Sequence, residues 1–336
     1  MQIKIWESDP ASGVQISVEK PRISGPPFAF FFPLPAPDPN PDCATDAFRY
    51  WNAAAALRRG ADFWGPAIGL NAQWFTGPVL EVNPDAGIDW NAAYTRRKLL
   101  FYRGRVNQDE FIYTANSADL LCHELGHAML DIAQPNLWHI GNEEADAFHE
   151  SFGDVSAILC ALQLPSVRDS LLATTGGAIS QDTTLSRIAE QFGTALYTMR
   201  PLEAAPNCLR NAHNNFNYVP PATLGLTGST AVLTSSPHSF SRVFTRAMLE
   251  ALAGMLAVQA PATADRLLDV TLELRDIMVE AAKAAPIVPQ YYASVAAKMV
   301  LAAQDKNVRL QRHVCRTFNP LISNGGCHLV LADATG

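Results

Sequence analysis

The sequence predicts an α+β fold in which strands come first and helices follow. Strand-like runs occupy much of the chain up to residue 115, and apolar residues recur at helical spacing through most of the remainder. No internal repeat interrupts this order. The order of strands and helices predicts three parts: N-terminal strands with a proline-rich arm in residues 1–44, a mixed lobe in 45–140 and a mainly helical lobe in 141–336.

The N-terminal strands are predicted at residues 2–6 (QIKIW) and 14–23. Residues 26–42 hold seven prolines and therefore cannot form a helix or a central strand. We expect an extended arm that packs on the body through its phenylalanines. The alternative is a proline-rich ligand for a partner domain.

The remaining elements follow from apolar spacing and from glycine and proline positions. Residues 45–60 predict a helix that ends at Gly60, and strand-like pieces follow at 78–82, 98–104 and 110–115. Pro165 and Pro261 fit helix boundaries. The later helices are predicted at residues 117–132, 143–163, 183–199, 241–259, 262–284 and 288–303.

Composition limits the function classes. Of the 336 residues, 48% are hydrophobic and 17% charged, which is typical of a well-buried globular protein. The net charge of −7 and the sequence pI of about 5.6 disfavour nucleic acid and an anionic membrane surface as partners. No apolar run is long enough to span a bilayer, so we expect no membrane segment. The start MQIKIWESDPASG lacks a signal-peptide pattern, so we expect a cytoplasmic or an undetermined location.

The six cysteines include no CxxC pair. Cys122 and Cys160 lie in apolar helical contexts and are expected to be buried thiols. Cys315 and Cys327 flank a short loop containing proline and glycine and could form a disulfide, although spacing alone decides little.

Residues 120–131 read LLCHELGHAMLD, in a predicted helix that Asn116 or Ser117 can cap. His123 and His127 are four residues apart, so their rings lie on one helix face, as two ligands of a tetrahedral zinc must. Glu124 stands next to His123, where it can take a proton from a zinc-bound water. The alternative is a helix with surface histidines, but the apolar flanks predict a buried face.

The next helix offers a third ligand. In EEADAFHESFGDVSA (143–157), Glu150 and Asp154 are four apart on one face. Glu150 would complete a three-ligand zinc site with one open position, and Asp154 could accept the free N–H of a ligand histidine. The alternative is a solvated acidic face. Apolar residues interleaved with the acids argue for a place against a core: Phe148, Phe152, Val155 and Ile158.

This pattern resembles the thermolysin-like neutral zinc metallopeptidases of the gluzincin clan. That family carries HExxH followed about twenty residues later by NExxSD, and in this chain His127 and Glu150 are 23 apart. His149 replaces the family asparagine and Gly153 the family serine. The resemblance implies a two-lobed metallopeptidase with the active-site helix between the lobes and one catalytic Zn²⁺.

Further matches lie outside the zinc helices. The Leu-Arg pair in APNCLRNAHNNFNY (205–218) implies that Arg210 binds the substrate carbonyl, and SPHSFSRVFTRA (236–247) implies that His238 stabilises the transition state. WNAAYTRRKLLFY (90–102) resembles the family's edge strand, which implies that Asn91 and Ala92 hold the extended peptide. A family tyrosine is missing between the zinc helices, and His139 or Trp138 could substitute for it.

The chain also departs from the family. Its residues after the glutamate helix, VSAILCALQLPSVRD, carry almost no carboxylates, so calcium is not expected at the family's usual cluster. The family's inhibitory pro-segment is not visible, which leaves open how activity is restrained.

The function predicted from these residues is zinc-dependent hydrolysis of a peptide or protein substrate by an endopeptidase. The resemblance implies an apolar residue after the cut. Glu124 is the general base, and Arg210 and His238 stabilise the oxyanion. Two alternatives remain: an inactive zinc-stabilised binding module, and a zinc amidohydrolase acting on a small non-peptide amide. Aminopeptidase action is disfavoured because no GxMEN-type element is present. The sequence gives no oligomeric state.

Overall fold

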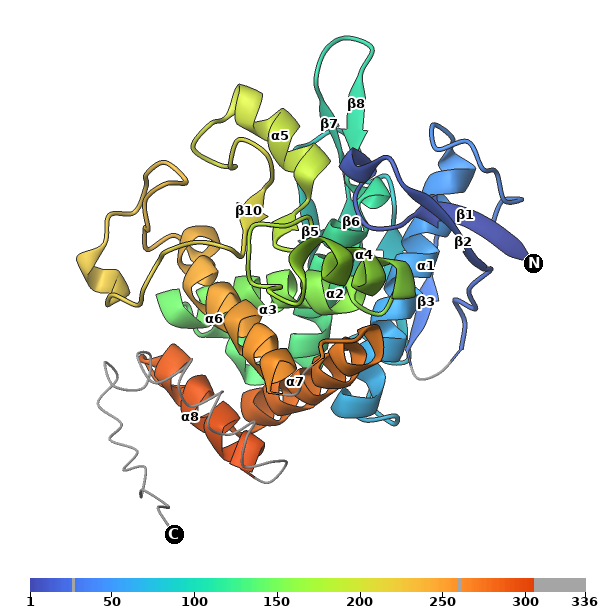
Figure 1. Cartoon of the computed structure of the whole chain (residues 1–336). Helices are drawn as coiled ribbons and strands as arrows, with labels where there is room; N and C mark the ends of the chain where they lie inside the picture. The colour runs from blue at the N-terminus through green and yellow to red at the C-terminus, as the bar shows by residue number, and fades with distance from the viewer. Residues whose placement is uncertain (26–27, 259–260, 305–336) are drawn as a thin grey trace.

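The computed structural model describes residues 1–25, 28–258 and 261–304, and within them it has the predicted α+β fold (Figure 1). The strands are β1 (Gln2–Trp6), β2 (Gln15–Glu19), β3 (Ala29–Phe31), β4 (Val79–Asn83), β5 (Ala92–Tyr94), β6 (Lys98–Phe101), β7 (Arg103–Arg105), β8 (Phe111–Tyr113), β9 (Arg187–Ile188) and β10 (Arg210–Asn211). The helices are α1 (Asp46–Ile68), α2 (Ala118–Ala133), α3 (Glu143–Ala161), α4 (Pro165–Thr175), α5 (Glu190–Met199), α6 (Pro237–Ala257), α7 (Ala264–Ala284) and α8 (Tyr291–Gln304). The domain boundaries near residues 44 and 140 stay predictions.

The main sheet has four strands in the order β3-β4-β6-β5. β3, β4 and β6 run parallel, while β5 is antiparallel to β6 with Ala93 opposite Leu100. β5 is therefore an edge strand, and α2 packs against both β5 and β6. This arrangement places a sheet edge directly beside the helix that carries the two histidines.

The proline-rich arm packs on the body as expected. Its β3 strand lies at the other edge of the sheet, where a segment bordered by prolines is tolerated. Phe28, Phe30 and Phe32 are buried, and Trp74 donates its indole N–H to the carbonyl of Ala29. The arm therefore packs through alternate phenylalanines, while Phe31 between them is exposed.

The first helix is longer than predicted, because Gly60 does not end it. α1 continues to Ile68 and ends at Gly69, whose φ of 126° favours glycine. Gly60 lies where α1 crosses α2, and a Cβ there would come within 2.5 Å of Leu125 Cδ2. Glycine at this position allows close helix packing, and the sequence reading mistook it for a helix stop.

Other helix boundaries also differ from the prediction. The stretch 183–199 is helical only from Glu190, since Arg187 and Ile188 instead pair with β10. The structure adds α4, for which Pro165 supplies the first helical residue. Two predicted helices begin at slightly different residues: α6 starts at Pro237 and α8 at Tyr291.

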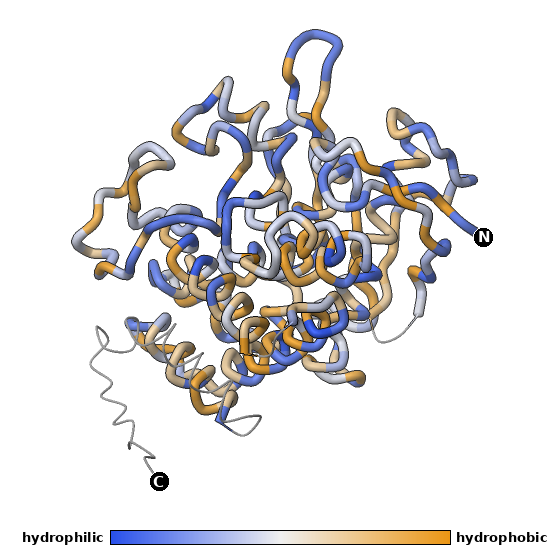
Figure 2. The backbone as a smooth tube through the Cα atoms, viewed as in Figure 1, coloured by the Kyte–Doolittle hydropathy of each residue, from blue (hydrophilic) through white to orange (hydrophobic). Residues whose placement is uncertain are grey.

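The helices form the core of the molecule. α2 packs on α1 and α3, and α3 packs in turn on α6 and α8. In Figure 2 the hydrophobic colour is concentrated in the central and lower helices, while the tip of the β7–β8 hairpin is hydrophilic. Cys122 and Cys160 are buried free thiols as expected, whereas Cys315 and Cys327 lie outside the described residues.

Within the described residues, no single helix has the length and apolarity needed to cross a membrane. The pair α3 and α4 passes that test only when taken together, and the two helices are bent by 94° relative to each other.

Candidate metal centre and cleft

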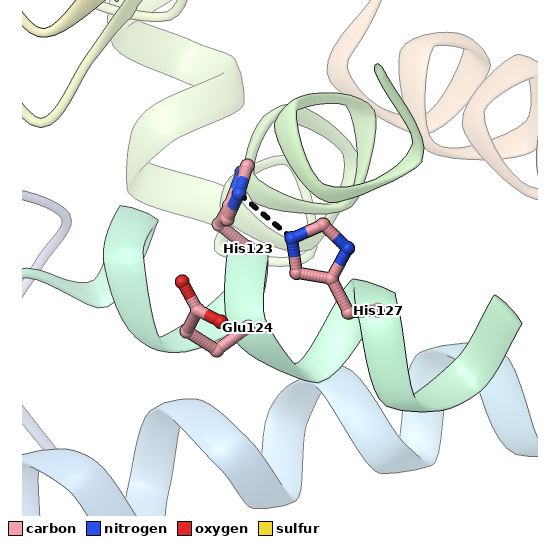
Figure 3. Close-up of side chains that lie close together, drawn as sticks. All are labelled: His123, Glu124 and His127. Carbon is pink, nitrogen blue, oxygen red and sulfur yellow. Dashed lines mark hydrogen bonds between the residues drawn. The ribbon is translucent and has the colours of Figure 1, made fainter. Parts of the chain in front are cut away.

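The two histidines project from one side of α2 (Figure 3). Ser117 caps this helix by accepting the N–H of Leu120, one of the two capping residues that the sequence suggested. His123 and Glu124 are buried, and Nε2 of His123 lies 3.1 Å from Nε2 of His127. Candidate ligand atoms of His123, Glu124 and His127 all lie within 4.8 Å of one another.

Glu150 comes from α3, which begins at the capping residue Asn142. Its Oε2 lies 3.4 Å from Nε2 of His123, and its Oε1 lies 3.7 Å from Nε2 of His127. Zinc bonds of about 2.0–2.1 Å at tetrahedral angles separate ligand atoms by roughly 3.3 Å. The separations of 3.1, 3.4 and 3.7 Å are close to that value, although each Glu150 oxygen faces a different histidine, so the two histidines and the Glu150 carboxylate can surround one ion.

Within the described residues, the Glu150 carboxylate has only long contacts to side-chain nitrogens, at 3.3–3.8 Å. Its Oε2 is buried and accepts no well-aligned hydrogen bond within the described part of the chain. A buried charged oxygen is costly unless it is paired or binds a metal. The Glu124 carboxylate, in contrast, is already engaged, because one oxygen accepts the N–H of Tyr94 at 2.7 Å. We therefore take Glu150, and not Glu124, as the third ligand.

Asp154 fixes the orientation of His123. Its Oδ1 lies 3.0 Å from Nδ1 of His123, so that nitrogen donates its proton and leaves Nε2 as the ligand atom. Arg210 binds the same carboxylate through Nε, at 3.1 and 2.9 Å, and through Nη2, at 2.7 Å. On the other side, a Cβ at Gly153 would come within 2.7 Å of the His123 ring. Glycine at this position leaves room for the His123 ring.

The charges of the cluster favour a cation. Burial would raise the pKa of Glu150, but the imidazoles of His238, His123 and His127 hold it well below its usual range. Burial would lower the pKa of His123, but its bonds to Asp154 and Glu150 raise it to about 10. Burial lowers the pKa of His127 to about 3. The ionised Glu150 carboxylate and the neutral His127 imidazole are ready donors, whereas His123 must release a proton before it can bind a divalent ion.

Glu124 faces the edge strand. Burial raises the pKa of its carboxyl to about 7, and the bond from the Tyr94 amide holds the side chain beside β5. The Tyr94 amide points away from β6, so the backbone groups of Ala92, two residues earlier, point to the same open side. Asn91 and Ala92 both line the adjacent cavity.

That cavity has a volume of about 890 Å³ and reaches His123, Glu124 and Arg210. Its apolar lining includes Phe192 and Leu196 of α5 together with Leu120 and Leu209. His238 stands at its mouth with 66% of its side chain exposed, and its Nε2 lies 3.3 Å from Glu150 Oε2. The structure thus brings Arg210 and His238 to the candidate metal centre.

His139 lies apart from this group. It is exposed, its Nε2 lies 3.0 Å from Nη1 of Arg96, and neither it nor Trp138 is among the residues that line the cavity. Trp138 instead packs edge-on against Tyr94. The geometry does not place either residue where the missing family tyrosine would act.

The sequence reading missed what holds the edge strand. The Tyr94 hydroxyl donates to Asp131 at 2.9 Å, and Arg96 binds the same carboxylate through Nε at 3.0 Å. Asp131 belongs to the last turns of α2, so this contact fastens β5 to the metal-site helix. Its only signal in the sequence is an aspartate one turn after His127 on a helix face expected to be buried.

Comparison with known proteins gives a fold match alone. No protein-family model matches the chain, and no curated protein sequence matches it. Among solved structures, the precursor of protealysin, a metalloproteinase from Serratia proteamaculans, aligns with a TM-score of 0.53. The alignment covers 96% of this chain and 87% of that chain at 17% sequence identity. The two chains share a fold. The subfamily and the roles of individual residues remain proposals.

Proposed function

We propose that this protein is a zinc-dependent endopeptidase. The observation that carries the proposal is the convergence of the His123 and His127 ring nitrogens with the Glu150 carboxylate, at 3.1–3.7 Å, beside the open edge of β5. A free strand edge next to a metal site suits a substrate that binds as an extended peptide. The fold shared with a metalloproteinase precursor supports the same conclusion.

His123, His127 and Glu150 would hold the ion. When bound, zinc supplies a Lewis acid that polarises a carbonyl and makes water more acidic. Asp154 keeps the His123 ring in the tautomer that binding requires. We expect no calcium at the family's usual cluster, and that expectation stays a prediction.

Glu124 would move the proton. Its carboxylate is held by the Tyr94 amide at 2.7 Å, so it stands between the edge strand and the histidines. From there it would accept a proton from the attacking water and deliver it to the leaving amine. A carboxyl pKa near 7 suits both steps, since the group must bind and release a proton within one cycle.

Arg210 and His238 would stabilise the oxyanion that forms at the attacked carbonyl. Asp154 holds Arg210 through Nε and Nη2. Within the described residues, Nη1 of Arg210 makes no hydrogen bond. That nitrogen can donate to substrate without loss of the guanidinium's anchor. His238, at the cavity mouth, can add a second donor.

The cleft favours a substrate with an apolar side chain next to the cut. The outward backbone N–H and C=O groups of Ala92 would pair with the peptide backbone, and the Asn91 side chain would also bind the peptide. Phe192, Leu196 and Leu209 line the cavity and would bury the adjacent side chain. These contacts favour a peptide over a small non-peptide amide, which would leave much of an 890 Å³ cavity unfilled.

Glu124→Gln tests the proposal. We expect the wild type to bind one zinc and to cleave a denatured protein, a chelator to abolish cleavage, and Glu124→Gln to keep its zinc but lose cleavage. Glu143→Gln is the matched control, because Glu143 is an exposed acid at the start of α3 and should change neither property.

Zinc retained without cleavage in any variant would instead identify a metal-stabilised binding module. Cleavage that survives in Glu124→Gln would remove Glu124 from the mechanism.

A further inference from the structure

The start of α5 is held by carboxylates from two distant parts of the chain. Ala189, the residue before α5, provides no side-chain cap. Its N–H is instead donated to Asp119 Oδ2 at 3.0 Å, and the Gln191 N–H is donated to Asp9 Oδ1 at 2.9 Å. Unpaired N–H groups at a helix start need such acceptors, and here neither acceptor is local.

This corner of the chain is under strain. Ala189 has a φ of 53°, in the left-handed region that costs a non-glycine residue about 1–3 kcal/mol. Such a conformation persists only where surrounding contacts impose it, and the two carboxylates are contacts of that kind. Asp9 is 2% exposed and Asp119 8% exposed, so both bonds lie out of water.

The corner is connected to the cleft on both sides. Immediately before it, Ile188 pairs with Arg210, the proposed oxyanion donor. Immediately after it, Phe192 and Leu196 form part of the apolar cavity wall. Gly193 lies between them, and a Cβ there would come within 1.9 Å of the Leu209 backbone nitrogen. The backbone of α5 therefore directly contacts the backbone of the residue before β10.

The two carboxylates have no cation beside them. Within the described residues neither Asp9 nor Asp119 forms an ion pair, and Oδ2 of Asp9 is buried without a hydrogen-bond partner. The third acid of the corner, Glu190, is paired with Arg187 at 2.8 Å, and Arg187 also binds Asp182. Ser117 and Cys122 are the other polar groups that face the pair, from α2.

We propose that Asp9 and Asp119 are positioning residues that hold α5, and with it the apolar wall of the cleft, in place while the pair retains a proton. This inference rests on the proposed function for its effect on substrate. Two buried carboxylates without an ion pair cannot both ionise without a large cost. Ionisation of both acids would therefore destabilise the corner that they hold.

The expected pH dependence follows from the direction of the shifts. Burial raises the pKa of Asp9, and burial together with the charge of Asp9 raises that of Asp119 well above its usual range. An acid whose pKa is raised by folding stabilises the fold below its unfolded value of about 3.9, and this stabilisation is lost as pH rises through the raised values. We therefore expect α5 to loosen as pH rises above about 4 and through the raised pKa values of the two acids.

Hydrogen exchange of the α5 amides, corrected for the intrinsic rate at each pH, measures this anchoring without any turnover. We expect wild-type protection to fall as pH rises above about 4. Asp119→Ala, which removes the acceptor, should lose protection at least fivefold at every pH. Asp119→Asn, which keeps an uncharged acceptor, should retain protection and lose its fall with rising pH. Asp9→Asn provides a second variant if Asp119→Ala does not fold.

The matched control is Asp265→Ala, an exposed acid in the first turn of α7, which should leave α5 unchanged. For a peptide with an apolar residue after the cut, KM should rise about fivefold in Asp119→Ala with kcat within about twofold. Protection unchanged in Asp119→Ala, or a fall with rising pH that persists in Asp119→Asn, would overturn the inference. A wild type that cleaves nothing would refute the proposed function instead, and the exchange data would still decide the anchoring.

Discussion

At the scale of single residues, His123 depends on groups at both ends of its ring. Nε2 faces His127 and Glu150, while Nδ1 donates to Asp154, which Arg210 also binds. One carboxylate therefore orients both a metal ligand and the proposed oxyanion donor. Spacing within α3 predicted that Asp154 would reach a histidine, but only the structure pairs it with Arg210.

Asp154→Asn should weaken zinc binding by about 10- to 100-fold, because the amide no longer favours the ligand tautomer of His123. Titration with a chromophoric zinc chelator measures the change. Asp269→Asn, an exposed substitution on α7, is the control. Unchanged affinity in Asp154→Asn would mean that the fold alone holds the ring.

At the scale of elements, the metal centre depends on how closely α2 and α3 approach. Gly126 lies between the two histidines, and a Cβ there would come within 2.8 Å of Ser156 Cβ and 2.9 Å of Gly153 Cα. Gly153 in turn faces the His123 ring. The pair of glycines lets the helices cross closely enough for Glu150 to reach both histidines.

Gly126→Ala should lower the free energy of unfolding by about 1–3 kcal/mol, because the added methyl group overpacks a contact with the backbone of α3. The better helix propensity of alanine, worth up to about 1 kcal/mol, offsets only part of this loss. Urea denaturation of the two proteins gives the difference. Ser170→Ala, an exposed change on α4, should stay within about 0.5 kcal/mol of wild type. Equal stability of Gly126→Ala and wild type would show that the crossing can relax.

At the scale of the whole molecule, the proposed ion joins two of the central helices. His123 and His127 belong to α2 and Glu150 to α3, and these helices pack on α1, α6 and α8. An ion that binds only the folded state stabilises it, by about 4 kcal/mol when its concentration is a thousand times Kd.

Removal of the metal by dialysis against a chelator should lower Tm by roughly 5–10 °C, and added zinc should restore it. Calorimetry on the two samples measures the shift. His127→Ala, which lacks one ligand, should melt lower from the start and respond little to the chelator. A wild-type Tm that is the same with and without chelator would argue against a zinc ion bridging α2 and α3.

The sequence by itself determined the α+β class and the two helices that carry the candidate metal ligands, with those ligands on one face of each helix. These depend on spacings of a few residues, and the geometry of a helix fixes which side chains share a face. The sequence overextended one helix and ended another at Gly60, since a glycine that permits close packing looks the same as one that stops a helix.

Only the tertiary structure decided which distant residues meet. It set His139 apart from the cleft, fastened β5 to α2 through Asp131, and joined Asp9 to an amide 182 residues away. Such contacts depend on how whole elements pack, and packing leaves no periodic trace in the local sequence.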